Sequence, residues 1–431
     1  MIKFYKAFER IFQRLLRSIA FLPIIISFGY LLFGIIIFYS RESEFILYLR
    51  EQLPQLFVQE ISTARTILSV IIGGIISLTV FSFSMVMVVL SQATTNFSPR
   101  LIPELIADRK HQVILGIYVG TLLFTINSLL YLGTNQSEGY HVGISVTISA
   151  FFCLICIGLF AYFIHNISNT IQVTRIIKNI HDQSKSFYDN EINNQKSFYV
   201  TSINEDTSDW HVIESPRTGY FGGLSEKIIS QRLKKTENKI LILPYDGQYV
   251  WSNEIIIKTK HRLSQVQKSD LLNALLFSAR RLDDRNTISG LIKLSEVAVK
   301  ALSPGINDPG TANDALLRIS NIMSMTLQLP PQKVKPIKDT GIVLISSFIT
   351  TKELLRLVIQ PIRFYGKDDL QITFTLVKSL KYLESLPHLS EAQIYEIEQE
   401  LALIQNYISE RSTYIAGTKD EQVIQDLFKK Q

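Results

Sequence analysis

ILSVIIGGIISLTVFSFSMVMVVLSQATTNFSPR, residues Ile67 to Arg100, is the stretch that decides the fold of this chain. Its first 24 residues, Ile67 to Leu90, include no charged side chain. An α-helix rises about 1.5 Å per residue, so roughly 20 apolar residues cross the hydrocarbon core of a bilayer. The stretch therefore predicts a membrane-spanning helix.

Three other apolar segments have the same character. The four predicted spans are Ser18–Tyr39, Ile67–Leu90, Val113–Leu132 and Val142–Ile164. The first follows a basic arm, as a signal peptide would, but its apolar run is too long for one and no cleavage site of small residues follows it. We therefore predict an uncleaved first span, and a membrane domain over residues 18–169.

The distribution of basic residues predicts the orientation. The N-terminal arm, residues 1–17, carries five Lys or Arg residues, and the loop after the second span carries Arg100, Arg109 and Lys110. The loop at 133–141 carries none. Because basic loops stay on the cytoplasmic side, both termini are expected there. Arg100, Arg109 and Lys110 form a membrane elbow at headgroup level, where they either contact anionic lipid or take part in gating or ligand contact.

The chain after the fourth span predicts a different organisation. Residues 170–210 are expected to form a stalk and linker, with a short strand near 197–203. Short apolar runs broken by turn residues predict a small β-rich subdomain over 211–258. Residues 259–431 show mainly helical spacing, including a helix over Lys268–Leu282, although the run at 341–348 has a strand pattern. The predicted fold class is mainly α: a four-helix transmembrane bundle followed by a mixed, mainly helical cytoplasmic domain.

The second span has one face of small and hydroxyl-bearing residues. It is formed by Gly73, Ser77, Ser84, Ser91 and Thr95, at steps of four residues or of seven, which is a three- and a four-residue step together. Small residues let helices approach closely, so this face predicts packing inside the bundle or at an oligomer axis. The alternative is a face that lines a polar pathway. No Asp, Glu, Lys or Arg lies at the centre of any predicted span, which argues against ion-coupled transport.

The most specific local motif is ALSPGINDPGTA, residues 301–312. Pro304 and Gly305 end one helix, and Asp308 before Pro309 is a typical start of the next. A helix–turn–helix corner explains most of this pattern. The functional alternative is a small-ligand or ion site. Its residues would be Ser303, Gly305, Asn307, Asp308 and Thr311.

Composition narrows the chemistry. The 431 residues are 47% hydrophobic and 19% charged, with a net charge of +6 and no basic run that favours nucleic acid. The two cysteines, Cys153 and Cys156, lie inside an apolar span and are interpreted as packing residues. The seven histidines show no metal-ligand spacing, and we expect no cofactor. His165 is interpreted as an interfacial histidine or, alternatively, as a contact near a pore mouth.

The elbow FSPRLIPELIADRKHQVILGIYVGTLLFT, the exit FIHNISNTIQ and the corner ALSPGINDPGTA together resemble a bacterial family of predicted membrane proteins, domain-of-unknown-function family 2254. The resemblance covers nearly the whole chain. It implies a multi-pass protein of the bacterial inner membrane with a cytoplasmic C-terminal region, and it implies no activity. From the resemblance alone, Arg363 is expected to pair with Asp308. Gly310 departs from the bulky residue common at that place in the family.

Two functions fit these observations. The first is an oligomeric channel-like or permeation-related protein, in which the second span lines the axis and the cytoplasmic domain regulates it. The second is a membrane-anchored sensor, scaffold or regulator that acts through its cytoplasmic domain. No nucleophile or metalloprotease motif is present, so we expect no enzyme. The expected partners are the lipid bilayer, further copies of the chain, and a small ligand or ion that the sequence does not identify.

Overall fold

The computed structural model divides the chain into two compact units, Met1–Arg175 and Ile176–Gln431. It describes residues 21–40, 60–96, 109–134, 143–170, 172–195, 199–200, 205–233, 236–278, 281, 286–329 and 331–410, with isolated residues at 48, 52, 58, 426 and 428.

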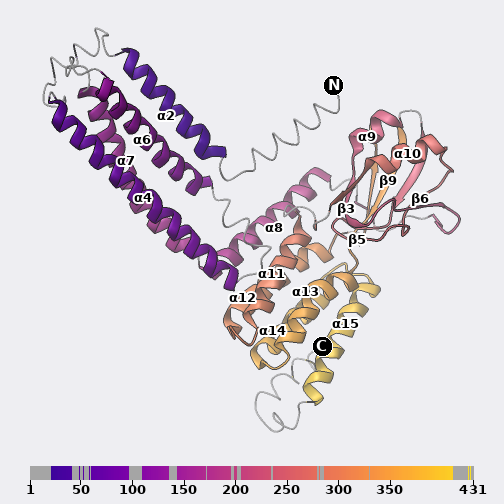
Figure 1. Ribbon diagram of the computed structural model, residues 1–431. Coiled ribbons are helices and arrows are strands. Elements are labelled where there is room, and N and C mark those ends of the chain that lie inside the picture. The colour runs from indigo at the N-terminus through magenta and orange to yellow at the C-terminus, as the bar shows by residue number, and fades with distance from the viewer. Residues whose placement is uncertain are drawn as a thin grey trace. The chain divides into compact units, whose positions relative to one another are not determined.

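The described part of the first unit is built of long helices. These are α2 (Phe21–Ser40), α4 (Ile61–Asn96), α6 (Arg109–Thr134) and α7 (Gly143–Thr170), which lie side by side in Figure 1. In α4, α6 and α7 the segments Ile61–Gln92, Arg109–Leu132 and Gly143–Ile167 are long and apolar enough to cross a membrane. The apolar part of α2, Phe21–Ile37, is shorter, so the first of the four predicted spans stays a prediction.

Helix α6 is the centre of this unit, because it contacts α2, α4 and α7. Its glycines allow the close approach of α2. A Cβ added at Gly116 would lie 3.0 Å from Pro23, and one added at Gly120 would lie 2.8 Å from the ring of Tyr30. On the other side of α6, Tyr118 is buried with Ile75 of α4 and Phe163 of α7. Small residues at the contact therefore determine how the helices pack.

Helix α4 is longer than the predicted span at both ends. It begins at Ile61, where the Glu60 carboxylate accepts hydrogen bonds from the hydroxyls of Ser62 and Thr63 (Thr63 Oγ1 to Oε2, 2.7 Å). Residues 61–66, which precede the predicted span, thus belong to this helix. Within the predicted elbow, Arg109 and Lys110 form the exposed start of α6. Arg100 lies outside the described residues.

The second unit contains two sheets. The larger has the strand order β1-β8-β9-β4-β6-β2, and the smaller has the order β5-β3-β7. Their bounds are β1 (Tyr199–Val200), β2 (His211–Glu214), β3 (Gly219–Leu224), β4 (Glu237–Ile242), β5 (Tyr249–Val250), β6 (Ile255–Thr259), β7 (Leu275–Ser278), β8 (Gln332–Pro336) and β9 (Gly341–Ser347). Strands β4 and β9 are parallel, whereas the other described pairings are antiparallel.

Helices complete the second unit. They are α8 (Val173–Gln195), α9 (Glu226–Arg232), α10 (Gln265–Ala274), α11 (Thr287–Ala301), α12 (Pro309–Leu327), α13 (Thr351–Gly366), α14 (Leu370–Glu384) and α15 (Glu391–Glu410). Helix α8 crosses the boundary between the units, and all of it from Ile176 onward belongs to the second unit. Helices α11 to α15 contact one another, whereas α9 and α10 pack together beside the sheets.

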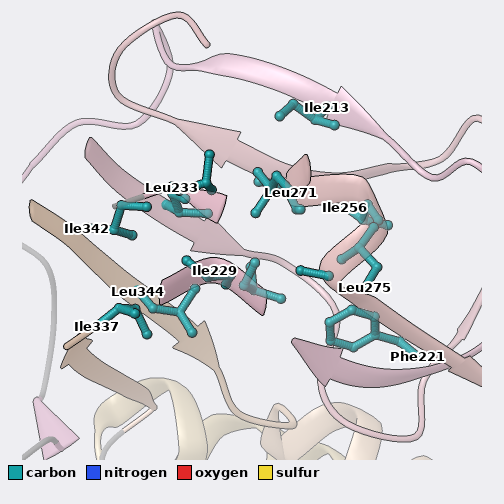
Figure 2. Close-up of a cluster of buried hydrophobic side chains, with 14 of the residues drawn as sticks. Ile213, Phe221, Ile229, Leu233, Ile256, Leu271, Leu275, Ile337, Ile342 and Leu344 are labelled. Atoms are coloured by element: carbon teal, nitrogen blue, oxygen red, sulfur yellow. The ribbon is translucent and has the colours of Figure 1, made fainter. Parts of the chain in front are cut away.

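The apolar core of the second unit lies between its sheets and the helices α9 and α10. Figure 2 shows Ile229 and Leu233 of the α9 region beside Leu271 of α10, with Ile342 and Leu344 of β9 facing them. Phe221 of β3 closes one end of this cluster. Burying such a side chain fully contributes about 1.5–3 kcal/mol. The core thus joins segments that are far apart in the sequence.

The helix predicted over Lys268–Leu282 was too long. Helix α10 ends at Ala274, and Leu275–Ser278 forms β7, which pairs with β3. Pairing with a neighbouring strand outweighs the helical spacing here, because strand preference depends on tertiary context. The strand predicted over 341–348 is confirmed as β9, and β1 lies within the predicted 197–203. Strand β8 was not predicted.

Helices α8 and α11 pack closely through one glycine. A Cβ added at Gly290 would lie 1.7 Å from Ser184 Oγ and 2.9 Å from Ser184 Cβ. Gly305, in contrast, has no described heavy atom within 4 Å of such a Cβ. The tight contact means that a methyl group at position 290 cannot be accommodated unless the helices move apart.

We therefore expect Gly290→Ala to destabilise the protein by about 1–3 kcal/mol, as overpacked cores do, and to lower the melting temperature of the detergent-solubilised chain. Adding Ser184→Gly should recover part of that loss, because it removes both clashing atoms. The control Gly305→Ala should change stability by no more than about 0.5 kcal/mol. Equal effects of the two alanine variants would contradict this packing.

Candidate functional site

A cavity of about 360 Å³ lies in the second unit, where the parallel strands β4 and β9 end. Ligands of sheets with parallel strands commonly bind outside the carboxyl ends of those strands. Here the loop after β4 and the last residues of β9 reach the same space. Its walls come from α8, β3, β8, the start of α11 and the end of α12. The residues that line it include Phe187, Tyr188, Glu191, Phe221, Gly222, Gly223, Leu224, Glu226, Asp246, Thr287, Thr326, Lys333, Lys335, Leu344, Ser346, Ser347 and Phe348.

Two ion pairs lie in the cavity wall. Strand β8 carries Lys333 and Lys335, which point to the same side because strand residues alternate. Lys333 Nζ lies 2.7 Å from Glu191 Oε1 on α8. Lys335 Nζ lies 2.7 and 2.9 Å from the two carboxylate oxygens of Glu226, at the start of α9. Each ammonium group in the described wall therefore already has a carboxylate partner.

Asp246 differs from these pairs. It follows β4 in the turn Tyr245–Asp246–Gly247, which the Gly247 N–H ties to the Phe221 carbonyl over 2.8 Å. Its side chain is exposed and forms part of the cavity wall. Gly223, with a φ of +83°, leaves room for this carboxylate, because a Cβ at position 223 would lie only 3.2 Å from Asp246 Oδ1. Within the described residues, no hydrogen bond or ion pair to this carboxylate is present.

The protein around Asp246 raises the pKa of its carboxyl group above the ordinary value. The largest cause is desolvation, since surrounding protein disfavours the charged form. Lys333 acts in the opposite direction, and Glu191 adds to the increase. The cavity thus holds a carboxyl group whose charge costs free energy in the folded protein.

The remaining walls are largely apolar and aromatic. Phe187 and Tyr188 come from α8, Phe221 from β3 and Phe348 from the end of β9. Binding sites for small molecules combine such surfaces with a few polar groups that fix orientation. The sequence alone did not reveal this site. The only local signal was the Asp-Gly turn after a buried strand, which predicts a turn and not a cavity.

The corner at residues 301–312 has a structural explanation. The Asp308 side chain caps α12 by accepting hydrogen bonds from the Thr311 N–H (3.0 Å) and hydroxyl (2.6 Å). The Ser303 hydroxyl donates to the Lys300 carbonyl, and Asn307 has a left-handed φ of +49°. Gly305 faces open space. The corner joins the end of α11 to the start of α12, whereas the cavity contacts the opposite ends of these helices.

The pairing expected between Arg363 and Asp308 is wrong. Arg363 Nε lies 2.6 Å from Glu400 Oε1, and both side chains are buried between α13 and α15. The guanidinium group also stands 5.5 Å from the centre of the Tyr407 ring. Asp308 is exposed and already occupied as a helix cap. A buried arginine requires a buried partner, which explains the choice of Glu400.

The hydroxyl face of α4 points away from its own bundle. Gly73, Ser77, Ser84 and Ser91 are exposed, whereas Ile75 on the opposite face is fully buried. The Ser77 hydroxyl donates to the carbonyl of Gly73, 2.9 Å away on the same helix. The face therefore does not pack inside this bundle. Thr95 lies in the last turn of α4, where side chains are outside the described set.

Of the other residues that the sequence singled out in the first unit, the two cysteines lie at helix contacts, whereas His165 is exposed. Cys156 is buried, with Sγ 3.5 Å from Thr121 Oγ1, and Cys153 is half-buried nearby. The Asn166 amide lies 3.4 Å from His111 Nε2, which links the end of α7 to the start of α6. In the part of the chain that the structure describes, no three metal-ligating side chains come together.

The opposite pKa directions of two aspartates predict opposite effects on stability. The raised pKa of Asp246 means that its charge destabilises the folded state above the pKa of the unfolded chain, about 3.9. Asp246→Asn should therefore raise the melting temperature at pH 7, and this gain should shrink as the pH falls toward about 3.

The matched control is Asp308→Asn. Hydrogen bonds from Thr311 lower the pKa of Asp308, so its charge stabilises the fold at neutral pH and that contribution is lost as the pH falls. This variant should lower the melting temperature at pH 7. Melting curves of both variants across pH test the pair, and a loss of stability in Asp246→Asn at pH 7 would contradict this description of the cavity.

Comparison with known proteins places the chain in a family. No solved structure matches it. Uncharacterized proteins of Mycobacterium bovis and Mycobacterium tuberculosis are 24% identical over 281 residues, which covers 61% of this chain and 52% of theirs. The chain thus spans about half the length of the curated relatives it matches. The family of predicted membrane proteins DUF2254 matches residues 16–382. The resemblance found in the sequence is therefore confirmed, and the chain belongs to the DUF2254 family of predicted membrane proteins.

Proposed function

We propose that this membrane protein is a sensor or regulator whose second unit binds a small molecule in the cavity at the ends of β4 and β9. The observation that carries the proposal is the cavity itself. Its volume of about 360 Å³ falls within the range of ligand pockets, roughly 300–1,000 Å³. Its lining combines aromatic surface with Asp246, a carboxylate without a partner among the described residues.

Helix α8 supports a regulatory role. It follows α7 in the chain, and α7 is one of the helices apolar enough to span a membrane. The same helix supplies Phe187, Tyr188 and Glu191 to the cavity wall. A ligand that contacts these side chains would act on the segment that leads directly to the membrane. A change in the position of α8 is the simplest way for such a ligand to affect the first unit.

The close packing of α8 would transmit such a change. Ser184 lies against Gly290, and His181 Nε2 lies 2.9 Å from Asn321 Oδ1 on α12. Packed interfaces tend to switch between discrete arrangements and do not deform continuously.

In this proposal the membrane part has four spans, formed by α2, α4, α6 and α7. It lies in the bacterial inner membrane with both termini in the cytoplasm.

The cavity assignment is tested with the full-length protein in nanodiscs, equilibrated with a metabolite extract of the expressing bacterium. Retained compounds are identified by mass spectrometry. We expect at least one compound on the wild type that is lost in Ser347→Trp, because the indole would fill the cavity. Ser385→Trp, at an exposed position elsewhere, is the control and should retain it. Identical retention by the wild type and Ser347→Trp would contradict the proposal.

A second candidate is an oligomeric channel-like protein. The observation in its favour is the outward face of α4, where Gly73, Ser77 and Ser84 leave small polar surface away from the bundle. Further copies of the chain could meet there around an axis. The role of the second unit would then be to regulate that pathway.

This candidate predicts unitary currents in planar bilayers that change when Ser84 is replaced by leucine. Phe83→Leu is the matched control, since Phe83 is an exposed apolar residue on the same helix and its position is rotated by about 100° from that of Ser84. It should leave the currents unchanged. Silent bilayers, with the protein shown to be folded and inserted, would exclude the pore and leave the sensor.

A further inference from the structure

We propose that the cavity recognises a small organic cation, whose ammonium or amidinium group binds the Asp246 carboxylate. This inference rests on the proposed function and deepens it, because it assigns the chemical class of the ligand. Four features support it: the charges of the wall, the arrangement of the carboxylates, the apolar surface of the cavity, and the backbone that holds Asp246.

The charged groups of the wall favour a cation over an anion. Lys333 and Lys335 are held by Glu191 and Glu226 at 2.7 Å. An anionic ligand would have to compete with these carboxylates for its contacts. Asp246 is the fifth charged group that the described wall contributes, and it leaves the set one negative charge in excess. A cation on Asp246 would neutralise that charge without breaking an existing pair.

The arrangement of the carboxylates favours an organic cation over a metal ion. Divalent ions such as Ca²⁺ and Mg²⁺ require several oxygen ligands that converge on one point. Within the described residues no three acidic, histidine or cysteine side chains converge in that way. Glu191 and Glu226 are also engaged with lysines from β8. A single carboxylate is instead sufficient for an ammonium group, through charge-assisted hydrogen bonds.

The surface beside Asp246 suits the organic part of such a ligand. Phe221, Leu344 and Phe348 line the same cavity, and Figure 2 shows Phe221 and Leu344 at the edge of the apolar core. Aromatic rings also attract cations through their faces. An amine with an aromatic or alkyl body would therefore place apolar surface on these side chains and its charge on Asp246.

The local backbone is built around this carboxylate. Gly223 leaves the space that Asp246 Oδ1 occupies, and the turn holding Asp246 is fixed by the Gly247 hydrogen bond to Phe221. Without a ligand, desolvation disfavours the charged form of Asp246 and raises the pKa of its carboxyl group. A binding site commonly carries such a cost, which the ligand offsets when it binds.

The test uses the full-length protein in zwitterionic nanodiscs and three probes of matched size: phenethylammonium, 2-phenylethanol and 3-phenylpropionate. Saturation-transfer NMR titrations measure binding, with empty nanodiscs as the reference for lipid uptake. We expect phenethylammonium to bind at least about tenfold more tightly than the other two, which corresponds to about 1.4 kcal/mol. Asp246→Asn should remove this preference, whereas Asp308→Asn, at the remote corner, should keep it.

The outcomes separate this inference from the proposed function. Equal binding of the three probes, weakened in all cases by Ser347→Trp, would overturn the assignment of a cation and leave the cavity as a ligand site. A preference that survives Asp246→Asn would also overturn it. If the folded wild type binds none of the three probes, the assignment of a cation is contradicted, whereas the cavity as a ligand site is decided by the metabolite retention of the wild type and Ser347→Trp.

Discussion

The parallel pairing of β4 with β9 is the interaction on which the second unit depends. The pairing runs from Glu237 beside Gly341 to Ile242 beside Ser346. Gly341 permits the approach, because a Cβ there would lie 2.5 Å from the Glu237 side chain. Parallel strands need a long crossover, and here it contains α10, β7, α11 and α12. Since both strands run in the same direction, the segments that follow them open onto one cavity, and β8 adds its lysines from the next position in the sheet.

Features with a local cause could be predicted from the sequence. The three long apolar helices follow from uninterrupted hydrophobic runs, and the start of α12 follows from Asp308 before Pro309. These signals depend on a few neighbouring residues and on backbone chemistry. The family resemblance likewise rests on contiguous motifs such as residues 301–312. The interactions within this motif are local too, because Asp308 caps α12 by accepting hydrogen bonds from Thr311, three residues further on. The most specific motif of the sequence is therefore a helix corner.

The cavity could not be predicted, because its parts meet only after folding. Glu191, Asp246 and Lys333 come from a helix, a turn and a strand that are distant in sequence. The ion-pair partner of Arg363 could not be predicted for the same reason, because Glu400 comes to lie beside it only in the folded protein. The direction of the α4 hydroxyl face was also a tertiary property. Helical spacing identified the face, but only the packing of α4 against α6 and α7 shows that it points outward.

In our proposal, small molecules enter the cavity and Asp246 keeps it negative. Thiol modification of the Ser347→Cys variant tests this most directly, with the unsubstituted protein as the reference for the native cysteines. The rate with cationic aminoethyl methanethiosulfonate is compared with the rate for the anionic sulfonatoethyl reagent. We predict a cation-to-anion ratio well above that of an exposed Ser385→Cys variant, and a loss of this excess when Asp246 becomes asparagine. The proposal would be contradicted if a thiol at position 347 does not react, or if the ratio of the two rates is the same with and without Asp246→Asn.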